Sequence, residues 1–544
     1  LGMLPGTLVF VNAGRELGQL DSLAGILSPG LLGAFVLLGV FPLIARKLLG
    51  LIQARRVYAG WHKPKNFDRN LLVIGAGAGG LVSAYIAAAV KAKVSLIEKH
   101  QMGGDCLNTG CVPSKALMRS AKRANELKKG PALGCTGVQG TVDFPAVMQR
   151  IQRVIADIEP HDSVERYTGL GVEVIQGEAK ILSPWSVEVN GQTLTSRNLI
   201  IAAGARPLVP KIPGLEQVQS YTSDSIWSLR EQPRWLLVLG GGPIGCELAQ
   251  AFQRLGSQVI QVELAERLLP REDADASELV LNSLRADGVD VRLQHRAERF
   301  EVVNGEQRMV ARRVDTGEEV TIAFDGLLLA LGRVANVSGY GVEELGLTVR
   351  PNGTLETDEY LATRFPNIYA VGDVTGPYQF THVAAHQAWY AAVNALFSGF
   401  KRFKVDYRVI PACTFTDPEV ARVGLSEGEA KAQNIAYEVT RYGIDDLDRA
   451  IADEAAHGFV KVLTVPGKDQ ILGVTIVGEH AGELLAESLL PMTHRLRLNK
   501  ILGTIHTYPT MAEANKYAAG EWKRAHAPQG VLRLVERFHT WRRS

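Results

Sequence analysis

The sequence predicts an α/β fold with two separate parallel-sheet units, preceded by a transmembrane segment. Two glycine-rich loops, each placed between an apolar run and a helical pattern, predict the two units. An uncharged stretch of 24 residues, 22–45, predicts the membrane segment. A chain of 544 residues is expected to form several domains, because single cores stop growing near ~250–300 residues.

Composition narrows the class of protein. Hydrophobic content of 46% and charged content of 21% are typical of a folded chain. A net charge of +2 gives no reason to expect nucleic acid as a partner. Five cysteines are too few for a disulfide scaffold and suit a reducing compartment. A close cysteine pair in such a chain is expected to be redox-active or metal-binding.

Residues 1–60 are expected to hold the membrane segment and a basic linker. Arg46, Lys47, Arg55 and Arg56 follow the uncharged stretch. By the positive-inside rule they place the later residues in the cytoplasm, anchored to the membrane. The alternative is a buried core helix. The run LPGTLVFVNAGRELG and the later FPLI resemble the C-terminal end of the SNARE-associated (DedA-like) membrane domain family, over roughly the first 45 residues.

The first glycine loop follows the basic linker. Leu71–Ile74 is an apolar run that predicts a buried parallel strand, and Gly75, Gly77 and Gly80 then give the pattern G-x-G-x-x-G. An alanine-rich helix and a second strand ending in Glu98 follow. The glycines let the backbone approach a pyrophosphate, and Glu98 can accept hydrogen bonds from a ribose. Strand, loop, helix, strand and terminal acid in this order predict a Rossmann-like dinucleotide-binding unit.

The same pattern recurs at Gly240, Gly242 and Gly245, with Glu263 at the end of the next strand. In both copies the acid lies 18 residues after the third glycine. Two such units predict two dinucleotides and favour electron transfer between cofactors. An acid at this position binds the ribose diol of NAD and repels the phosphate of NADP, so Glu263 predicts a preference for NADH.

A cysteine pair follows the first unit, in the run GGDCLNTGCVPSK. Cys106 and Cys111 lie shortly after Glu98, so they are expected beside the first nucleotide. The residues after Cys111 predict a helix with Pro113 in its first turn, and a helix N-terminus favours a thiolate. A structural disulfide would close too short a loop to restrict the unfolded chain much, and a metal site would need more ligands nearby. A dithiol that exchanges electrons with a neighbouring cofactor is therefore favoured.

Residues 67–523 resemble the class I pyridine nucleotide-disulfide oxidoreductases, which include dihydrolipoamide dehydrogenase, glutathione reductase and mercuric reductase. The run GGDCLNTGCVPSK is similar to the redox-active signature of this family. Further similar motifs follow in order: LIIAAGARP, LLLALGRVAN, NIYAVGDV, FTDPEVARVGLSE and YPTMAE.

The resemblance implies a discontinuous FAD-binding domain over 67–205 and 331–403, an NAD-binding domain over 206–330, and an α+β dimerisation domain over 404–523. It also implies a homodimer in which each active site uses residues of both chains. The expected FAD contacts are Gly75, Gly77, Gly80, Glu98, Gly104, Lys115, Ala179, Gly204 and Asp373. The expected NAD contacts are Gly240, Gly242, Gly245, Glu263 and Gly332.

The resemblance further implies the roles of the reacting groups. Cys111 matches the thiol stacked against the flavin and Cys106 the outer thiol that attacks substrate, while Lys115 and Glu247 match an ion pair near flavin N5. The implied function is transfer of a hydride from NADH through FAD to a Cys106–Cys111 disulfide, and on to an unidentified small-molecule or thiol/disulfide acceptor. No metal is expected. Activities like those of dihydrolipoamide dehydrogenase or mercuric reductase are the alternatives, and a redox-sensing domain of a membrane protein is an alternative of another class.

The sequence departs from the family's pattern at its closing motif. Disulfide reductases of the family carry a His before the Pro, held by a Glu, which moves a proton to the thiols. Here Tyr508 takes that place and Glu513 is retained, while His506 is expected to be structural. A tyrosine at this position resembles the pattern of mercuric reductase. The C-terminal cysteine pair of that enzyme is missing from this sequence, however, since the last cysteine is Cys413.

The C-terminal tail, residues 524–544, predicts an amphipathic helix. Its apolar residues fall on one helical stripe and its arginines elsewhere. The tail is expected either to lie on a membrane or to pack on the dimer. The stripe consists of Val531, Leu534, Val535, Phe538 and Trp541.

Overall fold

The computed structural model describes residues 56–137 and 140–544, together with residues 11, 14, 15, 36 and 40. The predicted membrane segment and the DedA-like stretch therefore lie outside the described residues, apart from those single positions. Within the described part of the chain, no helix is both long enough and apolar enough to span a bilayer.

The first sheet contains the first glycine loop. Its parallel part has the strand order β3-β2-β1-β6, and β17 returns much later in the chain to pair parallel with β6. Leu71, Leu72 and Val73 of β1 are fully buried, as a central parallel strand with both faces covered requires. The parallel strands are β1 (Arg69–Ile74), β2 (Val94–Glu98), β3 (Val172–Gln176), β6 (Gln192–Ile201) and β17 (Ile368–Ala370). An antiparallel extension is formed by β4 (Lys180–Ser183) and β5 (Ser186–Val189).

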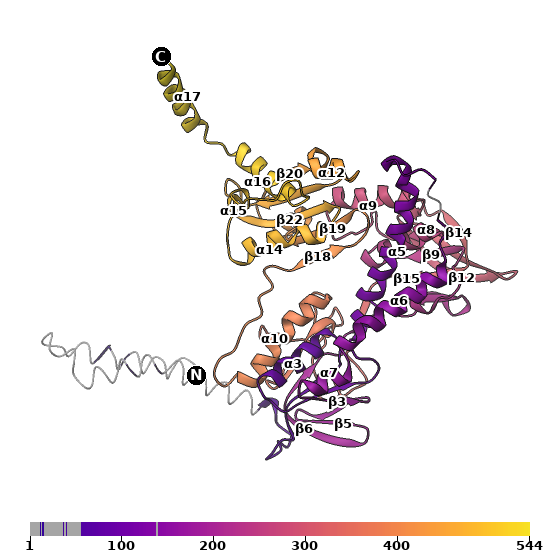
Figure 1. Cartoon of the computed structure of the whole chain (residues 1–544). Helices are drawn as coiled ribbons and strands as arrows, with labels where there is room; N and C mark the ends of the chain where they lie inside the picture. The colour runs from indigo at the N-terminus through magenta and orange to yellow at the C-terminus, as the bar shows by residue number, and fades with distance from the viewer. Residues whose placement is uncertain (1–10, 12–13, 16–35, 37–39, 41–55, 138–139) are drawn as a thin grey trace.

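Some helices of this part pack on the sheet, whereas the helix that begins at Cys111 packs against the second part of the chain, where Leu117 shares a hydrophobic core with Phe252. Figure 1 shows α3 (Ala78–Ala89) beside α10 (Thr381–Phe397), and the two helices pack together although they lie far apart in the sequence. The short α4 (Gly104–Asn108) holds Cys106, and α5 (Cys111–Lys129) begins at Cys111, which confirms the predicted helix there. The remaining helices of this part are α6 (Phe144–Ile158) and α7 (Val164–Gly169).

The second sheet contains the second glycine loop and is also parallel, with the order β11-β10-β9-β15-β8. Its strands are β8 (Ser220–Thr222), β9 (Trp235–Leu239), β10 (Gln258–Val262), β11 (Asp290–Arg292) and β15 (Gly326–Leu329). Its helices are α8 (Pro243–Leu255) and α9 (Ala274–Ala286). A separate antiparallel sheet is made by β12 (His295–Val303), β13 (Glu306–Arg313) and β14 (Glu319–Phe324). The segments between the two parallel sheets form a small antiparallel pair, β7 (Ala205–Pro207) with β16 (Arg333–Ala335).

The third part is an antiparallel sheet covered by helices, so the predicted α+β character is confirmed. Its strand order is β18-β19-β22-β21-β20. The strands are β18 (Pro411–Thr414), β19 (Glu419–Gly424), β20 (Glu438–Gly443), β21 (Phe459–Thr464) and β22 (Ile471–Gly478). The helices are α11 (Glu427–Ala432), α12 (Asp448–Ala452), α13 (Ala481–Leu484), α14 (Ala486–Thr493), α15 (Leu498–Leu502) and α16 (Glu513–Ala525).

Ion pairs join the second and third parts. The fully buried Lys461 ammonium lies 2.8 Å from a carboxylate oxygen of Asp273 and 3.0 Å from one of Glu427. A buried lysine requires such partners, because an unpaired charge in the interior is costly. The last helix, α17 (Gln529–Arg543), stands apart and extends away from the rest of the described chain (Figure 1).

Candidate active site

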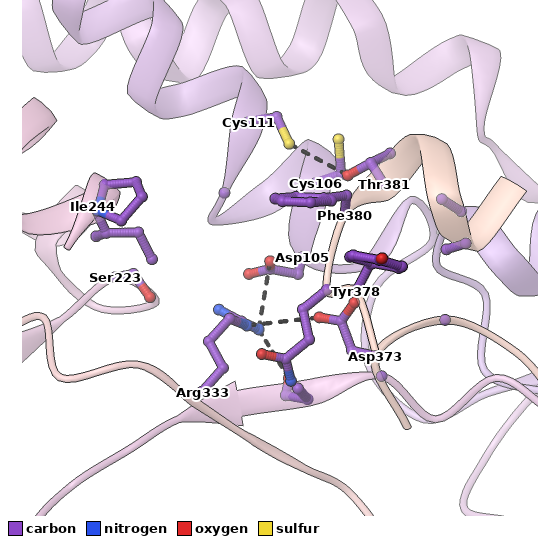
Figure 2. Close-up of a pocket in the computed structure, with 18 of the residues that line it drawn as sticks. Asp105, Cys106, Cys111, Ser223, Ile244, Arg333, Asp373, Tyr378, Phe380 and Thr381 are labelled. Atoms are coloured by element: carbon purple, nitrogen blue, oxygen red, sulfur yellow. Dashed lines mark hydrogen bonds and ion pairs between the residues drawn. The ribbon is translucent and has the colours of Figure 1, made fainter. Parts of the chain in front are cut away.

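A cavity of about 2010 Å³ is lined by both glycine loops, the cysteine pair and the start of the third part. Figure 2 shows a close-up in which Cys106, Cys111, Asp373 and Arg333 come together from segments far apart in the sequence. Most of the residues predicted to bind the two dinucleotides line it. These are Gly75, Gly77, Glu98, Gly104, Lys115, Ala179, Gly204, Asp373, Gly240, Gly242, Glu263 and Gly332.

The first glycine loop needs glycine for backbone reasons. Gly75 has φ +99°, and a Cβ atom there would lie 2.4 Å from the carbonyl oxygen of Ala202. A Cβ atom at Gly80 would lie 1.7 Å from the carbonyl oxygen of Gly75, so only glycine lets α3 begin this close to β1. The Glu98 carboxylate accepts a hydrogen bond from the Ala76 N–H at 2.7 Å. Glu98 is thereby fixed at the edge of the cavity, at the carboxyl end of β2.

The second loop repeats these contacts. Gly240 has φ +120° and a Cβ atom there would lie 2.3 Å from the Ala330 carbonyl oxygen, while one at Gly245 would lie 2.1 Å from the Gly240 oxygen. The Glu263 carboxylate accepts hydrogen bonds from the N–H groups of Gly241 and Ala265. Gly80 and Gly245 thus pack helix against strand and do not line the cavity, whereas the two acids do.

The two cysteines are free thiols in the structure, and Cys111 is the more acidic of them. The Cys111 Sγ lies 3.4 Å from the Thr381 Oγ1 (Figure 2). Hydrogen bonds from Cys106 and from Thr381, together with the positive charge of Lys115, lower the pKa of Cys111 to about 6, against the opposing effect of burial. The same shared hydrogen bond and burial raise the pKa of Cys106. A thiolate at neutral pH therefore resides on Cys111, at the N-terminus of α5.

Lys115 and Glu247 form an ion pair between α5 and α8. The Lys115 Nζ lies 2.9 Å from a Glu247 carboxylate oxygen, and Glu247 is buried. The Phe415 backbone N–H donates to the other Glu247 oxygen at 2.9 Å, and the Lys115 Nζ lies 4.3 Å from the centre of the Phe415 ring. Both carboxylate oxygens are thus satisfied, and the lysine head is held at the cavity wall near Cys111.

Arg333, which also lines the cavity, lies close to three carboxylates. Its guanidinium lies 3.4 Å from Asp105, 3.9 Å from Asp224 and 3.7 Å from Asp373, and its buried Nε has no hydrogen-bond partner in the described chain. Burial raises the pKa of Asp373 to about 6, although the Arg333 charge opposes the shift. Figure 2 shows Arg333, Asp105 and Asp373 around the space beneath the cysteine pair.

The residues present fit two dinucleotides. A Cβ atom at Gly242 would meet no atom within 4 Å and one at Gly77 only Gly104 at 3.9 Å, so backbone N–H groups at both helix N-termini have room for a pyrophosphate. The carboxylates of Glu98 and Glu263 are placed to accept ribose hydroxyls. The Arg333 Nε, which has no hydrogen-bond partner in the described chain, and the half-buried Asp373 are polar groups for which a polar ligand would supply partners.

Tyr508 and Glu513 are not among the described residues that line this cavity. Tyr508 is 65% exposed, and its hydroxyl donates to Asp448 at 2.9 Å. Glu513 is buried and accepts hydrogen bonds from the Thr510 N–H and the Tyr517 hydroxyl, both at 3.3 Å.

His506 has a structural setting within the same motif. Its Nε2 lies 2.7 Å from a Glu487 carboxylate oxygen and its Nδ1 lies 3.0 Å from the Thr504 carbonyl oxygen. Both ring nitrogens are therefore engaged in fixing the loop.

Sequence reasoning missed three residues of the site. Thr381 contacts Cys111 from a position 270 residues away, so no local pattern indicates it. Phe415 was part of a quoted motif but had no assigned role. Arg333 stands in the motif LLLALGRVAN, but the acids that it meets, at positions 105, 224 and 373, are distant in the sequence, so no local pattern indicates them.

Comparison with known proteins identifies the family. Residues 69–388 match the model of the pyridine nucleotide-disulphide oxidoreductases, and residues 410–519 match the dimerisation domain of these enzymes. The chain belongs to this family.

Relatives agree with this assignment. A mercuric reductase of Bacillus cereus is 34% identical over 83% of this chain and 71% of its own length. A dihydrolipoyl dehydrogenase of Chlamydia trachomatis serovar D is 34% identical over 81% of this chain and 94% of its own length. The structure of RclA, a HOCl-induced flavoprotein disulfide reductase of Escherichia coli, is 28% identical with a TM-score of 0.73, and covers 83% of this chain and 99% of that protein. The protein is thus a flavin-dependent NAD(P)H disulfide oxidoreductase that uses FAD and NAD(P)H and carries the dimerisation domain.

Proposed function

We propose that this protein uses NADH to reduce the Cys106–Cys111 pair, which then passes two electrons to an oxidised acceptor. The observation that carries this proposal is the position of the pair, in one cavity with both glycine loops. FAD, when bound, supplies the means of passing an electron pair between a nicotinamide and a dithiol.

The two thiols take different roles in this proposal. The Cys111 thiolate, favoured by Thr381 and Lys115, is the group beside the cofactor. Cys106 is the exchanging thiol. With a disulfide acceptor, the Cys106 sulfur attacks one sulfur and expels the other as a thiolate, and the Cys111 thiolate then attacks Cys106 and releases the second thiol. The protein pair ends oxidised, and the acceptor gains two electrons and two protons.

The coenzyme preference rests on Glu263. Its carboxylate is held at the cavity edge by two backbone N–H groups, and a second negative charge on the adenosine ribose would lie against it. NADH is therefore the proposed donor.

The proposed active site is completed by a second chain. Tyr508 and Glu513 lie in the part that matches the dimerisation domain and away from the cavity of their own chain. In the proposed homodimer they reach the cysteine pair of the partner. The domain limits predicted from the sequence, with one FAD-binding domain in two segments, are retained in this proposal.

The proposed location is the cytoplasmic face of a membrane. An uncharged stretch at residues 22–45 followed by Arg46 and Lys47 supports a single span with the enzyme on the basic side. The full chain should stay with the membrane fraction after an alkaline carbonate wash, and release by that wash would contradict the span.

An anaerobic reductive titration tests the proposed function. The FAD-loaded protein should take up four electrons per FAD, two for the flavin and two for the disulfide. Cys106→Ser should take up two, and Cys413→Ser, at a cysteine outside the pair, should still take up four. Uptake of two electrons by the unmutated protein would exclude the dithiol from electron transfer.

Steady-state NADH oxidation then separates an enzyme from a sensor. Lipoamide, glutathione disulfide, Hg(II) and a quinone should be offered in turn. Sustained turnover with any one of them supports an enzyme and identifies the acceptor class, whereas a single reduction per FAD with all four would favour the redox-sensing alternative.

A further inference from the structure

The C-terminal helix α17 has no partner within the described chain. None of its residues is buried, and no hydrogen bond or ion pair connects it to another described element. Its large apolar side chains are exposed, with Trp541 at 73% and Leu534 at 63%. An apolar face left in water on a folded protein is expected to be covered by another surface.

Five of the six large exposed apolar side chains of α17 form one stripe, and the sixth, Leu532, lies off it. Val531, Leu534, Val535, Phe538 and Trp541 are spaced by one, three and four residues, which places them on the same side of a helix. The rings of Phe538 and Trp541 lie 6.1 Å apart, so the two aromatic groups are adjacent near the C-terminal end.

The charges on α17 are nearly all positive. The helix carries four arginines and one acid, Glu536. Arg533, Arg537 and Arg543 project from the polar side, and the Arg542 guanidinium lies 5.8 Å from the centre of the Phe538 ring. Arg542 lies four residues after Phe538 and therefore on the stripe itself, where an arginine can bury its aliphatic part while its charged head reaches an anionic group.

This combination points to one kind of partner. We propose that α17 lies in the plane of an anionic lipid bilayer, with the apolar stripe in the acyl region and the arginines at the lipid phosphates. Amphipathic helices with aromatic residues on one face and arginines on the other bind membranes in this way. Two copies of α17 packed face to face would bring together eight arginines and only two acids, so charge complementarity favours an anionic lipid surface over a second chain.

Two further facts support a bilayer. The match to the dimerisation domain ends at residue 519, before α17 begins, so the family's dimer does not account for this helix. The same chain holds the uncharged stretch at residues 22–45, which independently predicts a membrane.

Site-specific photo-crosslinking tests the proposal in the full, FAD-loaded chain. Leu534, on the stripe, is replaced by the photoreactive amino acid benzoylphenylalanine, and Thr540, on the polar side, by the same amino acid as the matched control. The protein is reconstituted into phosphatidylcholine vesicles with and without phosphatidylserine and then irradiated.

The expected result is a lipid adduct at position 534 that exceeds the adduct at position 540 by about fivefold or more in vesicles with phosphatidylserine. Arg533→Gln with Arg537→Gln should remove the dependence on phosphatidylserine, and Phe538→Glu should remove the adduct itself. NADH oxidation in detergent should be unchanged in all variants, because α17 lies outside the cavity. Equal labelling at both positions, or a crosslink between two protein chains in place of the lipid adduct, would overturn the proposal.

Discussion

The two glycine loops have the same local structure but are covered differently by the rest of the chain. In both, the first glycine has a positive φ, the third lies against the carbonyl of the first, and an acid binds the loop N–H groups. The first loop is also covered by two other segments. A Cβ atom at Gly104 would lie 2.7 Å from the Gly77 Cα, and one at Gly79 would lie 2.9 Å from the Val371 side chain. The second loop is covered by one following segment, because the Leu269 N–H donates to the Gly241 carbonyl oxygen at 2.8 Å, and a Cβ atom at Gly242 would meet nothing within 4 Å.

This difference explains how one motif can serve two purposes. A loop covered by segments from two distant parts of the chain suits a cofactor that stays bound, whereas a loop covered by one nearby segment suits a coenzyme that must enter and leave in each cycle. The motif supplies the phosphate site in both loops, and we interpret the additional segments over the first loop as a means of retaining its ligand. We therefore expect FAD to copurify with the protein and NADH to exchange.

The largest effect is expected from Gly104→Ala, which disturbs the cover of the first loop. The residue has φ +59° and its new Cβ atom would press on Gly77. Strain and overpacking together cost about 2–5 kcal/mol, so FAD affinity should fall by about 30-fold or more. The ratio of flavin to protein absorbance after purification measures this.

The matched control is Gly242→Ala in the second loop, at a position where a Cβ atom would meet nothing within 4 Å. It should keep FAD at the unmutated ratio and raise the KM for NADH, since the added methyl group meets only the incoming coenzyme. Loss of FAD from both variants would show that the two loops do not differ in the way the structure indicates.

The next prediction concerns the coenzyme preference, which Glu263 is expected to set and Glu98 is not. NADH should exceed NADPH in kcat/KM by about 10- to 100-fold, because a phosphate against the Glu263 carboxylate costs about 1–3 kcal/mol. Glu263→Gln should lower the ratio of kcat/KM for NADH to that for NADPH, because it removes the repelling carboxylate charge. Arg271, which also lines the cavity, then remains available to the phosphate of NADPH. Glu98→Gln should lower FAD retention and leave the ratio unchanged. Steady-state kinetics with both coenzymes gives the answer, and equal use of NADPH by the unmutated protein would show that Glu263 does not select.

The next prediction concerns the pKa values of the two thiols. In the reduced protein Cys111 should be a thiolate above pH 6 and protonated below it, since its pKa is lowered to about 6. At pH 7 its thiolate fraction should exceed that of an ordinary cysteine by about 30-fold. Alkylation by iodoacetamide, followed residue by residue by mass spectrometry across pH, locates both midpoints. Cys106→Ala should move the Cys111 midpoint upward, because the first hydrogen-bond donor is lost.

A spectroscopic check uses the FAD-loaded protein. Cys106→Ser should show a long-wavelength absorbance from a thiolate next to the flavin, and Cys111→Ser should not. Identical spectra from the two variants would contradict the assignment of Cys111 to the cofactor side.

Much of this arrangement could be predicted from local sequence, and the remainder depends on distant contacts. The glycine loops, Glu98, Glu263 and the helix that begins at Cys111 lie within short continuous patterns, because backbone geometry and capping act locally. The cover over the first loop could not be predicted in this way. Val371 packs on the first loop and Thr381 contacts Cys111 from positions that follow the whole second sheet in the sequence.

The acceptor side has its own feature, Tyr508, which lies outside both loops. Thiol exchange needs a group that holds and releases a proton near neutral pH. An ordinary histidine titrates near ~6.5 and a tyrosine near ~10, and the hydrogen bond to Asp448 raises the pKa of Tyr508 further. Tyr508 is therefore a weak base at neutral pH, and the unmutated protein should reduce lipoamide slowly although NADH reduces its flavin quickly.

The smallest expected effect is a gain from Tyr508→His. General acid–base help is worth about 10²–10⁴-fold, and an imidazole near Glu513 and Asp448 should recover part of it, raising lipoamide turnover about tenfold. Tyr508→Phe is the control and should show no gain. Stopped-flow reduction of the flavin by NADH should be the same in all three proteins, because Tyr508 lines neither loop. Rapid lipoamide turnover by the unmutated protein would contradict this prediction, because it would show that the proton is moved without an imidazole at position 508. If both variants then lost lipoamide turnover equally, the Tyr508 hydroxyl would be the group that moves the proton.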